Sequence, residues 1–498
     1  MELGLRGGPD SVIVDASGVR RYEDVAERSQ RIAGALGAHA VQPADRVALL
    51  LLPTAEFVSA FFALLRLGAC VVVLSPLHPP PEMRAMLDDA GVGLVLTESA
   101  LLAHLGEAAT GRRVVRLEDL SSGASGEGPL APSARKDALQ LYTSGTTGRP
   151  KGAILTHENL ATQQRLLRDA WAFSEADVLL HALPLHHMHG LVIALMTALG
   201  SGASVRMLPR FDARVVWDSF AQVSVFMGVP AMYTRLVEAF HAADGATQTR
   251  WREGARGLRL ATSGSAALPV PVADAWEAIA GSIPLERFGM TEIGVGLTNP
   301  LAPEERRRGF CGVPLPTVEA RVVDDAGVDS DTGELWIRGP SVFGGYFGRE
   351  EENRKAFVAD PLGGAPWFRT GDTVLRDTAA GGAFRILGRT SVDILKSGGY
   401  KLSALEIEGI ILELGAVAAV AVVGVPDPRW GERVVACIVP AEGRESECDA
   451  NTVREHVKHK LAPYKCPKDV VLLAELPRNA LGKVVKPELI RRLARLTP

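Results

Sequence analysis

The sequence has few aromatic residues and no long apolar run. Phe, Trp and Tyr make up 6% of the 498 residues, and no segment interleaves aromatic with basic side chains as nucleic-acid-binding surfaces do. The net charge of −4 gives no sign of a polyanion partner. The longest apolar stretches, such as residues 415–425, are far shorter than the ~20 residues that cross a bilayer. We therefore expect no nucleic acid and no membrane among the partners.

Cysteine is also scarce, and its spacing excludes two kinds of site. The five cysteines have no CxxC spacing, so neither a disulfide framework nor a zinc site is expected; they are Cys70, Cys311, Cys437, Cys448 and Cys466. Residues 1–6 contain no basic segment followed by an apolar run, which is the pattern of a secretory signal. From these absences we expect a cytoplasmic protein. Its length predicts two or more domains.

The densest polar motif is the loop Leu-Tyr-Thr-Ser-Gly-Thr-Thr-Gly-Arg-Pro-Lys-Gly at residues 141–152. Its glycines permit sharp turns, and consecutive backbone N–H groups in such turns bind anions. Hydroxyl side chains and Lys151 add further phosphate-binding groups. A solvated loop is the alternative, since loops also collect Gly, Ser and Thr. The common P-loop is excluded because Pro150 separates the glycines from Lys151, so a strand–loop–strand phosphate clamp is predicted.

Alternating buried strands and helices predict a mostly parallel, doubly wound α/β sheet. Two such β/α regions are expected before residue 300, and a small antiparallel β region at about 308–388. A small α+β domain of about 110 residues follows, which divides the chain into 1–388 and 389–498. The expected strands include residues 46–52, 70–74, 92–96, 178–182, 204–207, 223–229, 258–263, 284–288, 318–323, 333–338, 417–425 and 434–439, and the expected C-terminal helices include 402–414 and 449–461.

Two polar clusters follow strands of the second β/α region. Pro-Leu-His-His-Met-His-Gly at 184–190 contains His186, His187 and His189. A metal site is one interpretation, but a polar wall of a substrate pocket is favoured because no carboxylate or Cys shares the cluster. In Thr-Ser-Gly-Ser-Ala-Ala-Leu-Pro at 262–269, Ser265 lies either at the ligand-binding end of a strand or at a helix N-cap.

Three later clusters carry further charged candidates. Glu-Arg-Phe-Gly-Met-Thr-Glu at 286–292 presents Thr291 and Glu292 after a strand, and a carboxylate beside a phosphate clamp indicates a magnesium ligand. Asp372 follows Phe-Arg-Thr-Gly, where a tight turn is expected, and either accepts bonds from ribose hydroxyls or closes an Asx-turn. Lys483 ends Pro-Arg-Asn-Ala-Leu-Gly-Lys at 477–483; by itself it would be an ordinary surface lysine.

In this order and spacing, the motifs resemble the acyl-adenylate-forming superfamily, which includes acyl-CoA synthetases, luciferases and nonribosomal adenylation domains. The resemblance covers nearly the whole chain. It implies an N-terminal domain that carries the ATP and acyl sites and a mobile C-terminal domain that swings between two half-reactions. The implied catalytic residues are His187, Thr291, Glu292 and Lys483.

The resemblance also assigns the nucleotide site. Glu292 would position Mg²⁺, and Lys483 would bridge the substrate carboxylate and the α-phosphate. The implied ATP-binding residues are Thr143, Ser144, Gly145, Thr146, Thr147, Gly148, Arg149, Pro150, Lys151, Phe288, Gly289, Asp372, Arg389 and Lys483. Two positions depart from the superfamily pattern, because Phe288 replaces a common Tyr and His186 a common Phe. The hinge segment is one residue longer than usual, which places the hinge near Val392.

Within the superfamily, the chain is most similar to malonyl-CoA synthetases. Residues 183–190, the Gly-Val-Pro-x-x-Tyr-x-Arg pattern ending at Arg235, and residues 397–406 carry this similarity. An Arg fork meets a carboxylate bidentately, so Arg235 is expected to hold the distal carboxylate of a dicarboxylate. A helix cap or surface ion pair is the alternative role for Arg235. The implied acyl-binding residues are Arg235, Ser265, His187, His189 and Met290, and the implied CoA-binding residues are Gly398, Gly399 and Lys401.

The expected reaction joins malonate or methylmalonate to CoA through an acyl-adenylate, consumes ATP, and releases AMP and pyrophosphate. A CoA ligase for another short or aryl carboxylic acid is the first alternative. A nucleotide-binding protein without catalysis is the second, although retention of both Glu292 and Lys483 argues against it. We expect a monomer or weak homodimer.

Overall fold

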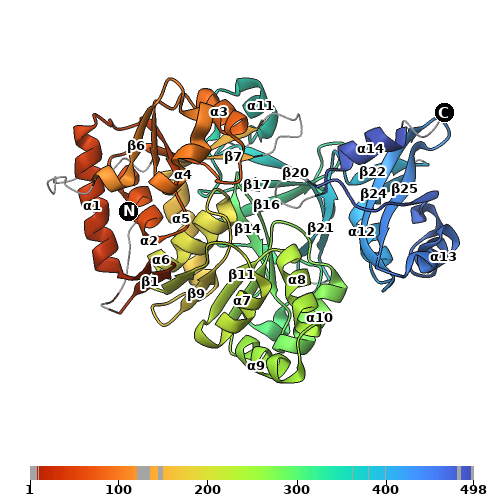
Figure 1. The fold of residues 1–498 in the computed structure, drawn as a ribbon. Helices are drawn as coiled ribbons and strands as arrows, with labels where there is room; N and C mark the ends of the chain where they lie inside the picture. The colour runs from red at the N-terminus through yellow and green to blue at the C-terminus, as the bar shows by residue number, and fades with distance from the viewer. Residues whose placement is uncertain are drawn as a thin grey trace.

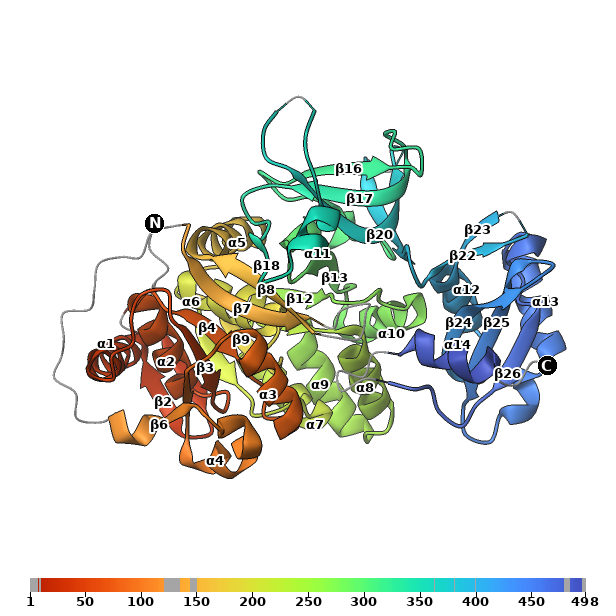
Figure 2. The same ribbon diagram turned by 90° about the horizontal axis from the view of Figure 1, so that it is seen from above.

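The computed structural model describes residues 8, 10–120, 135–143, 150–361, 363–379, 381–398, 400–478 and 484–494. Four β-sheets organise this part of the chain. Three of them form the larger body, and the fourth lies in the C-terminal region, drawn in blue on one side of that body (Figures 1 and 2). The predicted combination of mostly parallel N-terminal sheets, a small antiparallel region and a C-terminal region of mixed helices and strands is confirmed.

A seven-stranded sheet has the order β18-β8-β7-β4-β3-β5-β6. Strands β7, β4, β3, β5 and β6 run parallel, whereas β8 turns back on β7 and β18 closes the edge beside β8. The strands are β3 (Arg46–Leu50), β4 (Cys70–Val73), β5 (Leu94–Thr97), β6 (Arg113–Arg116), β7 (Asp137–Thr143), β8 (Lys151–Thr156) and β18 (Gly345–Tyr346).

A nine-stranded sheet has the order β15-β14-β13-β12-β11-β9-β10-β1-β2. Its central strands from β1 to β13 run parallel, and antiparallel strands finish both edges. The strands are β1 (Val12–Asp15), β2 (Gly18–Arg21), β9 (Val178–His181), β10 (Ser204–Met207), β11 (Val225–Gly228), β12 (Leu260–Ser263), β13 (Leu285–Met290), β14 (Gly294–Thr298) and β15 (Val313–Pro314).

Helices cover both faces of these sheets. In β3, Val47 and Leu49 join a core with α1, α2, α5 and the π-helical segment η3, whereas Ala48 and Leu50 join a core with α3 and α4. Helices α7 to α10 cover the outer face of the nine-stranded sheet. The helices are α1 (Tyr22–Ala38), α2 (Ala55–Arg66), α3 (Pro80–Asp89), α4 (Ser99–Leu105), α5 (His157–Ala170), η3 (His189–Met196), α6 (Thr197–Gly200), α7 (Ala213–Ser219), α8 (Pro230–His241), α9 (Gly245–Arg256) and α10 (Val270–Ala280). None of the helices in the described ranges is long and apolar enough to cross a membrane.

The third sheet is the predicted antiparallel region, with the order β16-β17-β20-β19 and β21 paired to β20. Figure 2 shows it projecting from the two larger sheets. Its last pair places Asp372 of β20 opposite Arg389 of β21. The elements are β16 (Glu319–Val323), β17 (Thr332–Arg338), α11 (Glu350–Ala356), β19 (Phe357–Val358), β20 (Trp367–Asp377) and β21 (Ala383–Arg389).

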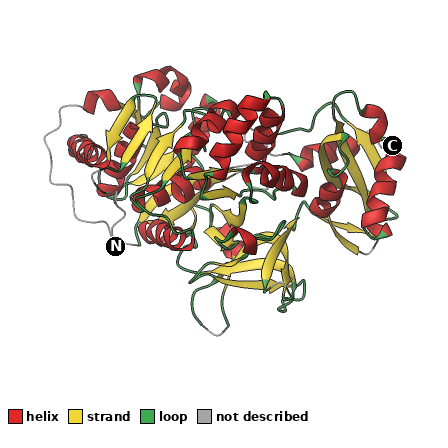
Figure 3. Cartoon of the chain, turned by 90° about the horizontal axis from the view of Figure 1, so that it is seen from below, coloured by secondary structure: helices red, strands yellow, loops and turns green. Residues whose placement is uncertain are grey.

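The C-terminal sheet has helices on both faces (Figure 3). Along β24, Val420 and Val422 face α12 and α13, whereas Ala421 and Val423 face α14, as the period of two in a strand requires. The elements are β22 (Ile394–Ser397), β23 (Tyr400–Ser403), α12 (Ala404–Ile411), β24 (Val417–Asp427), β25 (Gly431–Pro440), α13 (Ala450–Lys460), β26 (Asp469–Leu472) and α14 (Lys486–Ala494).

The first helix of this region begins later than residue 402, where the sequence placed it. Ser403 ends β23 with an extended backbone, and its hydroxyl accepts a hydrogen bond from Glu406 N at 3.1 Å. This bond satisfies one of the free N–H groups at a helix start. Helix α12 therefore begins at Ala404, and the two preceding residues belong to a strand.

Candidate active site

The predicted phosphate clamp connects two antiparallel strands. Thr143 at the end of β7 is paired with Lys151 at the start of β8, which confirms the strand–loop–strand interpretation. The residues at 144–149 lie outside the described part of the chain. Lys151 is half-buried, and its Nζ lies 5.4 Å from the centroid of the Tyr346 ring. The lysine therefore lies against an aromatic face rather than in open solvent.

Glu292 lies beside this clamp. The carboxylate is 4% exposed, and its Oε1 accepts a hydrogen bond from the Tyr346 hydroxyl at 2.8 Å. Burial raises the pKa of Glu292, while the Tyr346 bond and the positive charges of Arg389 and Lys151 lower it. One carboxylate and two cations are thus close enough to influence one another electrostatically, as a site for a polyphosphate and its cation requires.

Asp372 and Arg389 meet at the edge of the antiparallel sheet. Arg389 Nε lies 3.2 Å from Asp372 Oδ1, and Arg389 Nη1 donates to Thr370 O at 2.9 Å. The expectation that Asp372 follows a tight turn is wrong. It lies within the eleven-residue strand β20, where Gly371, with φ of 70°, occupies an irregularity in the pairing with β17.

A second group of polar side chains surrounds His189. This imidazole is 6% exposed, its Nδ1 lies 3.4 Å from Ser265 Oγ, and its Nε2 has no hydrogen-bond partner among the described residues. Burial, Arg287 and the neighbouring His181 and His187 hold its pKa well below the ordinary value. The imidazole is therefore neutral at pH 7 and can accept or donate one hydrogen bond.

Arg287, on strand β13, is a buried arginine with guanidinium nitrogens that lack partners among the described residues. It is 5% exposed, and its Nε and Nη2 have no hydrogen-bond partner there. Burial lowers its pKa to about 9, so it still carries its charge at pH 7. A buried cation without a partner is costly, which indicates that an anionic ligand completes this site.

Gly264 permits this position of Arg287. A Cβ atom at residue 264 would lie 2.4 Å from Arg287 Cζ, so any side chain there would displace the guanidinium. The next residue, Ser265, has a left-handed backbone with φ of 72°. The expectation of Ser265 as a helix N-cap is wrong, because Pro269 precedes α10 in that place. Ser265 instead belongs to the loop that packs on His189 and Arg287.

Arg235 does not join this buried group. It is exposed on α8, and its guanidinium lies 5.0 Å from the centroid of the Phe211 ring. No hydrogen bond or ion pair connects it with another described residue. Its predicted role in holding a carboxylate stays a prediction. Four other predicted residues lie together, half-buried, on β13 or just after it; they are Phe288, Gly289, Met290 and Thr291.

The predicted CoA-binding residues lie in the C-terminal region. Gly398 is exposed between β22 and β23, and Trp430 packs against it. Lys401 forms an ion pair with Asp325, which comes from the larger body. Gly399 and Lys483 lie outside the described residues.

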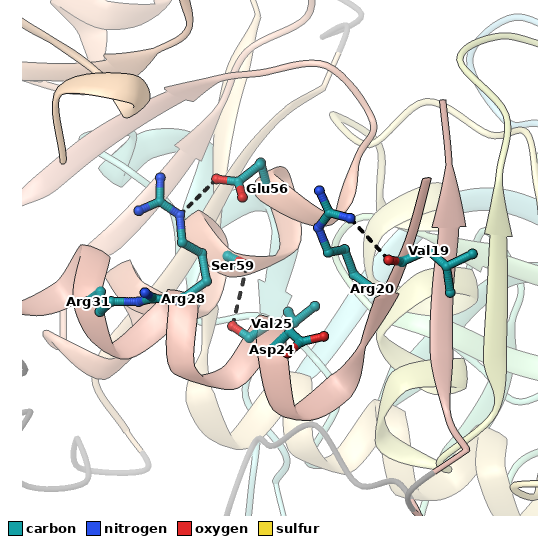
Figure 4. Close-up of a pocket in the computed structure, with 8 residues that line it drawn as sticks. All are labelled: Val19, Arg20, Asp24, Val25, Arg28, Arg31, Glu56 and Ser59. Atoms are coloured by element: carbon teal, nitrogen blue, oxygen red, sulfur yellow. Dashed lines mark hydrogen bonds and ion pairs between the residues drawn. The ribbon is translucent and has the colours of Figure 1, made fainter. Parts of the chain in front are cut away.

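A pocket of about 370 Å³ lies elsewhere, between β2, α1 and α2 (Figure 4). It contains none of the predicted site residues. Its charges are largely internal, since Arg28 Nε lies 3.0 Å from Glu56 Oε2 and its other nitrogens donate to Leu117 O and Leu120 O. These contacts hold α1 against its neighbours. The charged groups of this pocket therefore have a structural role in packing α1.

The histidine tract forms a cluster of packed imidazole rings. The rings of His78 and His186 lie 5.2 Å apart, and those of His186 and His187 lie 4.1 Å apart. Burial, and to a lesser extent the nearby His78, lower the pKa of His187 to about 4. Within the described ranges, no group of three or more His, Cys, Asp or Glu side chains could hold a metal ion. The favoured interpretation, a polar wall, fits this arrangement.

Two residues with apparent roles were not predicted. Arg287 lies inside the 286–292 motif. A charged arginine in a strand that is otherwise expected to be buried could have indicated a binding residue. Tyr346 lies 54 residues beyond its partner Glu292. No spacing rule connects such distant positions, so only the fold reveals that pair.

Comparison with known proteins identifies the family. The AMP-binding enzyme family matches residues 5–347, and the AMP-binding enzyme C-terminal domain matches residues 406–483. The chain is 38% identical to the mitochondrial malonate–CoA ligase ACSF3 of Mus musculus, over 98% of this chain and 89% of the relative. It is similar to ATP-bound MatB from Rhodopseudomonas palustris, with a TM-score of 0.91, 32% identity and full coverage of both chains. It is also similar to a malonyl-CoA ligase complex with methylmalonyl-CoA and AMP, with a TM-score of 0.69, 36% identity and coverage of 95% of this chain and 98% of the other. The chain belongs to the AMP-binding enzyme family.

Proposed function

We propose that this protein is an ATP-dependent acid–thiol ligase that forms malonyl-CoA, or methylmalonyl-CoA, from the free dicarboxylate. The observation that carries the substrate assignment is the buried, unpartnered guanidinium of Arg287 beside His189. A monocarboxylate uses its one carboxylate in the reaction and leaves such a cation uncompensated. The second carboxylate of malonate would neutralise it through charge-assisted hydrogen bonds. The names of the relatives support the same substrate.

In the first half-reaction, a carboxylate oxygen attacks the α-phosphorus of ATP and pyrophosphate leaves. The nucleophile and the triphosphate are both anions, so the main task is to hold them together against repulsion. Lys151 and the predicted clamp residues bind phosphate oxygens, and Asp372 accepts hydrogen bonds from the ribose. Lys483 stabilises the charge that develops between the two reacting groups.

The residues around Glu292 fit a magnesium ion. Mg²⁺ is usually bound by one or two carboxylates together with substrate phosphates and water, and Glu292 is a buried carboxylate beside a cationic clamp. When bound, the ion neutralises phosphate charge. The protein's part is to present the Glu292 carboxylate in a fixed orientation.

In the second half-reaction, the CoA thiol attacks the acyl carbon and AMP leaves. We propose that residues 389–498 rotate against residues 1–388 between the two steps, with the hinge near Val392. The TM-score is lower for the complex with methylmalonyl-CoA and AMP than for the ATP-bound relative, although sequence identity is higher for the former. A rotated domain would give this result, because a TM-score compares both domains at once. Gly398, Gly399 and Lys401 would then line the path of the thiol.

ATP–pyrophosphate exchange with a panel of acids tests the assignment. Malonate or methylmalonate is expected to support exchange far better than butyrate or benzoate. A monocarboxylate has no second carboxylate and so leaves Arg287 without a counter-ion. Absence of exchange with every acid would refute the proposed ligase activity. Equal exchange with butyrate and malonate would refute a dicarboxylate as the substrate, and a preference for benzoate would favour an aryl acid ligase. A cytoplasmic location and a monomeric or weakly dimeric state stay predictions.

A further inference from the structure

Tyr346 contacts two charged residues from distant motifs. Its hydroxyl donates to Glu292 Oε1 at 2.8 Å, and its ring faces Lys151 Nζ at 5.4 Å from the centroid. The proposed cation ligand and the phosphate-binding lysine therefore meet at one aromatic side chain. Tyr346 is thus the shared neighbour of both charged groups.

The position of Tyr346 is fixed by its backbone and its ring. Strand β18 pairs with β8 so that Tyr346 lies opposite Ala153, beside the start of the clamp strand (Figure 2). The Asn353 side chain accepts from Tyr346 N at 2.7 Å and donates to Tyr346 O at 2.9 Å. The ring of Phe343 packs edge-on against the tyrosine at 4.9 Å. The hydroxyl is thus held in place by contacts that involve no ligand.

This hydroxyl sets the orientation of the Glu292 carboxylate. One carboxylate oxygen accepts the tyrosine bond, which leaves the other oxygen for a ligand. Magnesium demands near-ideal octahedral geometry, so a carboxylate that is free to rotate binds it less well. A phenylalanine ring would keep the contact with Lys151, because the attraction of an ammonium group comes from the ring face. The hydroxyl and the ring therefore have separable effects.

We propose that Tyr346 is a positioning residue that holds Glu292 in the orientation required by the magnesium ion of MgATP. This inference rests on the proposed function, since it assumes that Glu292 ligates that ion. It assigns to the β18 strand a role in ATP binding that its sequence does not indicate.

The test measures binding of α,β-methylene-ATP, which cannot form an adenylate, by calorimetry with either Mg²⁺ or EDTA. Wild type is compared with Tyr346→Phe and with Tyr22→Phe. The second variant is a matched control, because it also removes a buried tyrosine hydroxyl, the donor to Ala203 O, but far from the site. With Mg²⁺, Tyr346→Phe is expected to bind the analogue about tenfold more weakly, the effect of losing one hydrogen bond to a charged group. With EDTA, all three proteins are expected to bind alike.

The control outcomes separate the inference from the proposed function. Equal weakening of Tyr346→Phe in Mg²⁺ and in EDTA, or no weakening in either, would overturn the positioning role. A wild-type protein whose binding ignores Mg²⁺ would instead contradict the proposed ATP site. Tyr346→Leu provides a second variant, since loss of the ring as well should weaken binding in EDTA too. Thermal unfolding of each unliganded variant confirms that it is folded.

Discussion

Gly264→Ala should damage the use of malonate without touching the ATP site. The added Cβ would lie 2.4 Å from Arg287 Cζ and 2.5 Å from Arg287 Nε. Ordinary contact begins near 3.4 Å, so the guanidinium must retreat by about 1 Å. A misplacement of that size can lower a rate about 100-fold. Loss of one charge-assisted hydrogen bond, about 1.5–3 kcal/mol, gives a similar factor.

The assay is pyrophosphate release with malonate and with butyrate, at varied ATP. We expect kcat/KM for malonate to fall about 100-fold, the rate with butyrate to change little, and the KM for ATP to stay the same. Gly245→Ala in α9 is the matched control, because a Cβ there meets no atom within 4 Å. Unchanged malonate kinetics, or an equal loss for both acids, would refute the assignment of Arg287 to the distal carboxylate.

Four further changes have distinct expected results. Arg235→Ala tests the assignment made from the sequence: a role at the distal carboxylate in addition to that of Arg287 would lower exchange with malonate and spare short monocarboxylates, as the same acid panel would show. Lys483→Ala should stop adenylation yet leave thioester formation from supplied acyl-adenylate intact. Lys486→Met removes an ammonium group that lies within 2.7 Å of two largely buried carboxylates, those of Asp393 and Glu408, and should cost about 3–5 kcal/mol in chemical unfolding. Burial raises the pKa of Glu286 to about 7, so its contribution to stability is present at low pH and is lost as pH rises through 7. Relative to Glu286→Gln, the unfolding free energy of wild type should therefore fall by about 3 kcal/mol between pH 4.5 and 8; equal pH curves would contradict this.

Local pattern was sufficient for the central strands. The four-residue strand β10 was predicted with its observed bounds; its apolar residues Val205 and Met207 alternate with polar ones and are the buried ones, as the period of two in a strand requires. The phosphate hairpin followed for a similar reason, since Pro150 excludes the usual helix after the glycines. Element ends were less predictable. The polar residues around Ser403 and Ser265 suit either a cap or a strand end, and only long-range packing decides between them.

The candidate site was predictable only where its residues share a motif. Glu292 was found because it follows a strand and a glycine, and Asp372 because it follows Thr-Gly, although the turn expected there is a bulge. Arg287 carries the substrate assignment through its lack of a partner, and burial without a partner is a property of the fold. The same holds for Tyr346, whose interaction with Glu292 depends on strand β18 lying beside β8.

The position of β18 also affects how the protein forms during synthesis. The clamp strand β8 acquires this neighbour from a segment roughly 190 residues further along the chain. Contacts of such long sequence separation form late, because loop closure must precede them. A nascent chain that has emerged only through the nine-stranded sheet therefore has its glycine-rich hairpin but lacks the tyrosine beside it. Competence to bind nucleotide should therefore not arise before this strand docks, and fragments that end before Gly345 should not bind ATP normally.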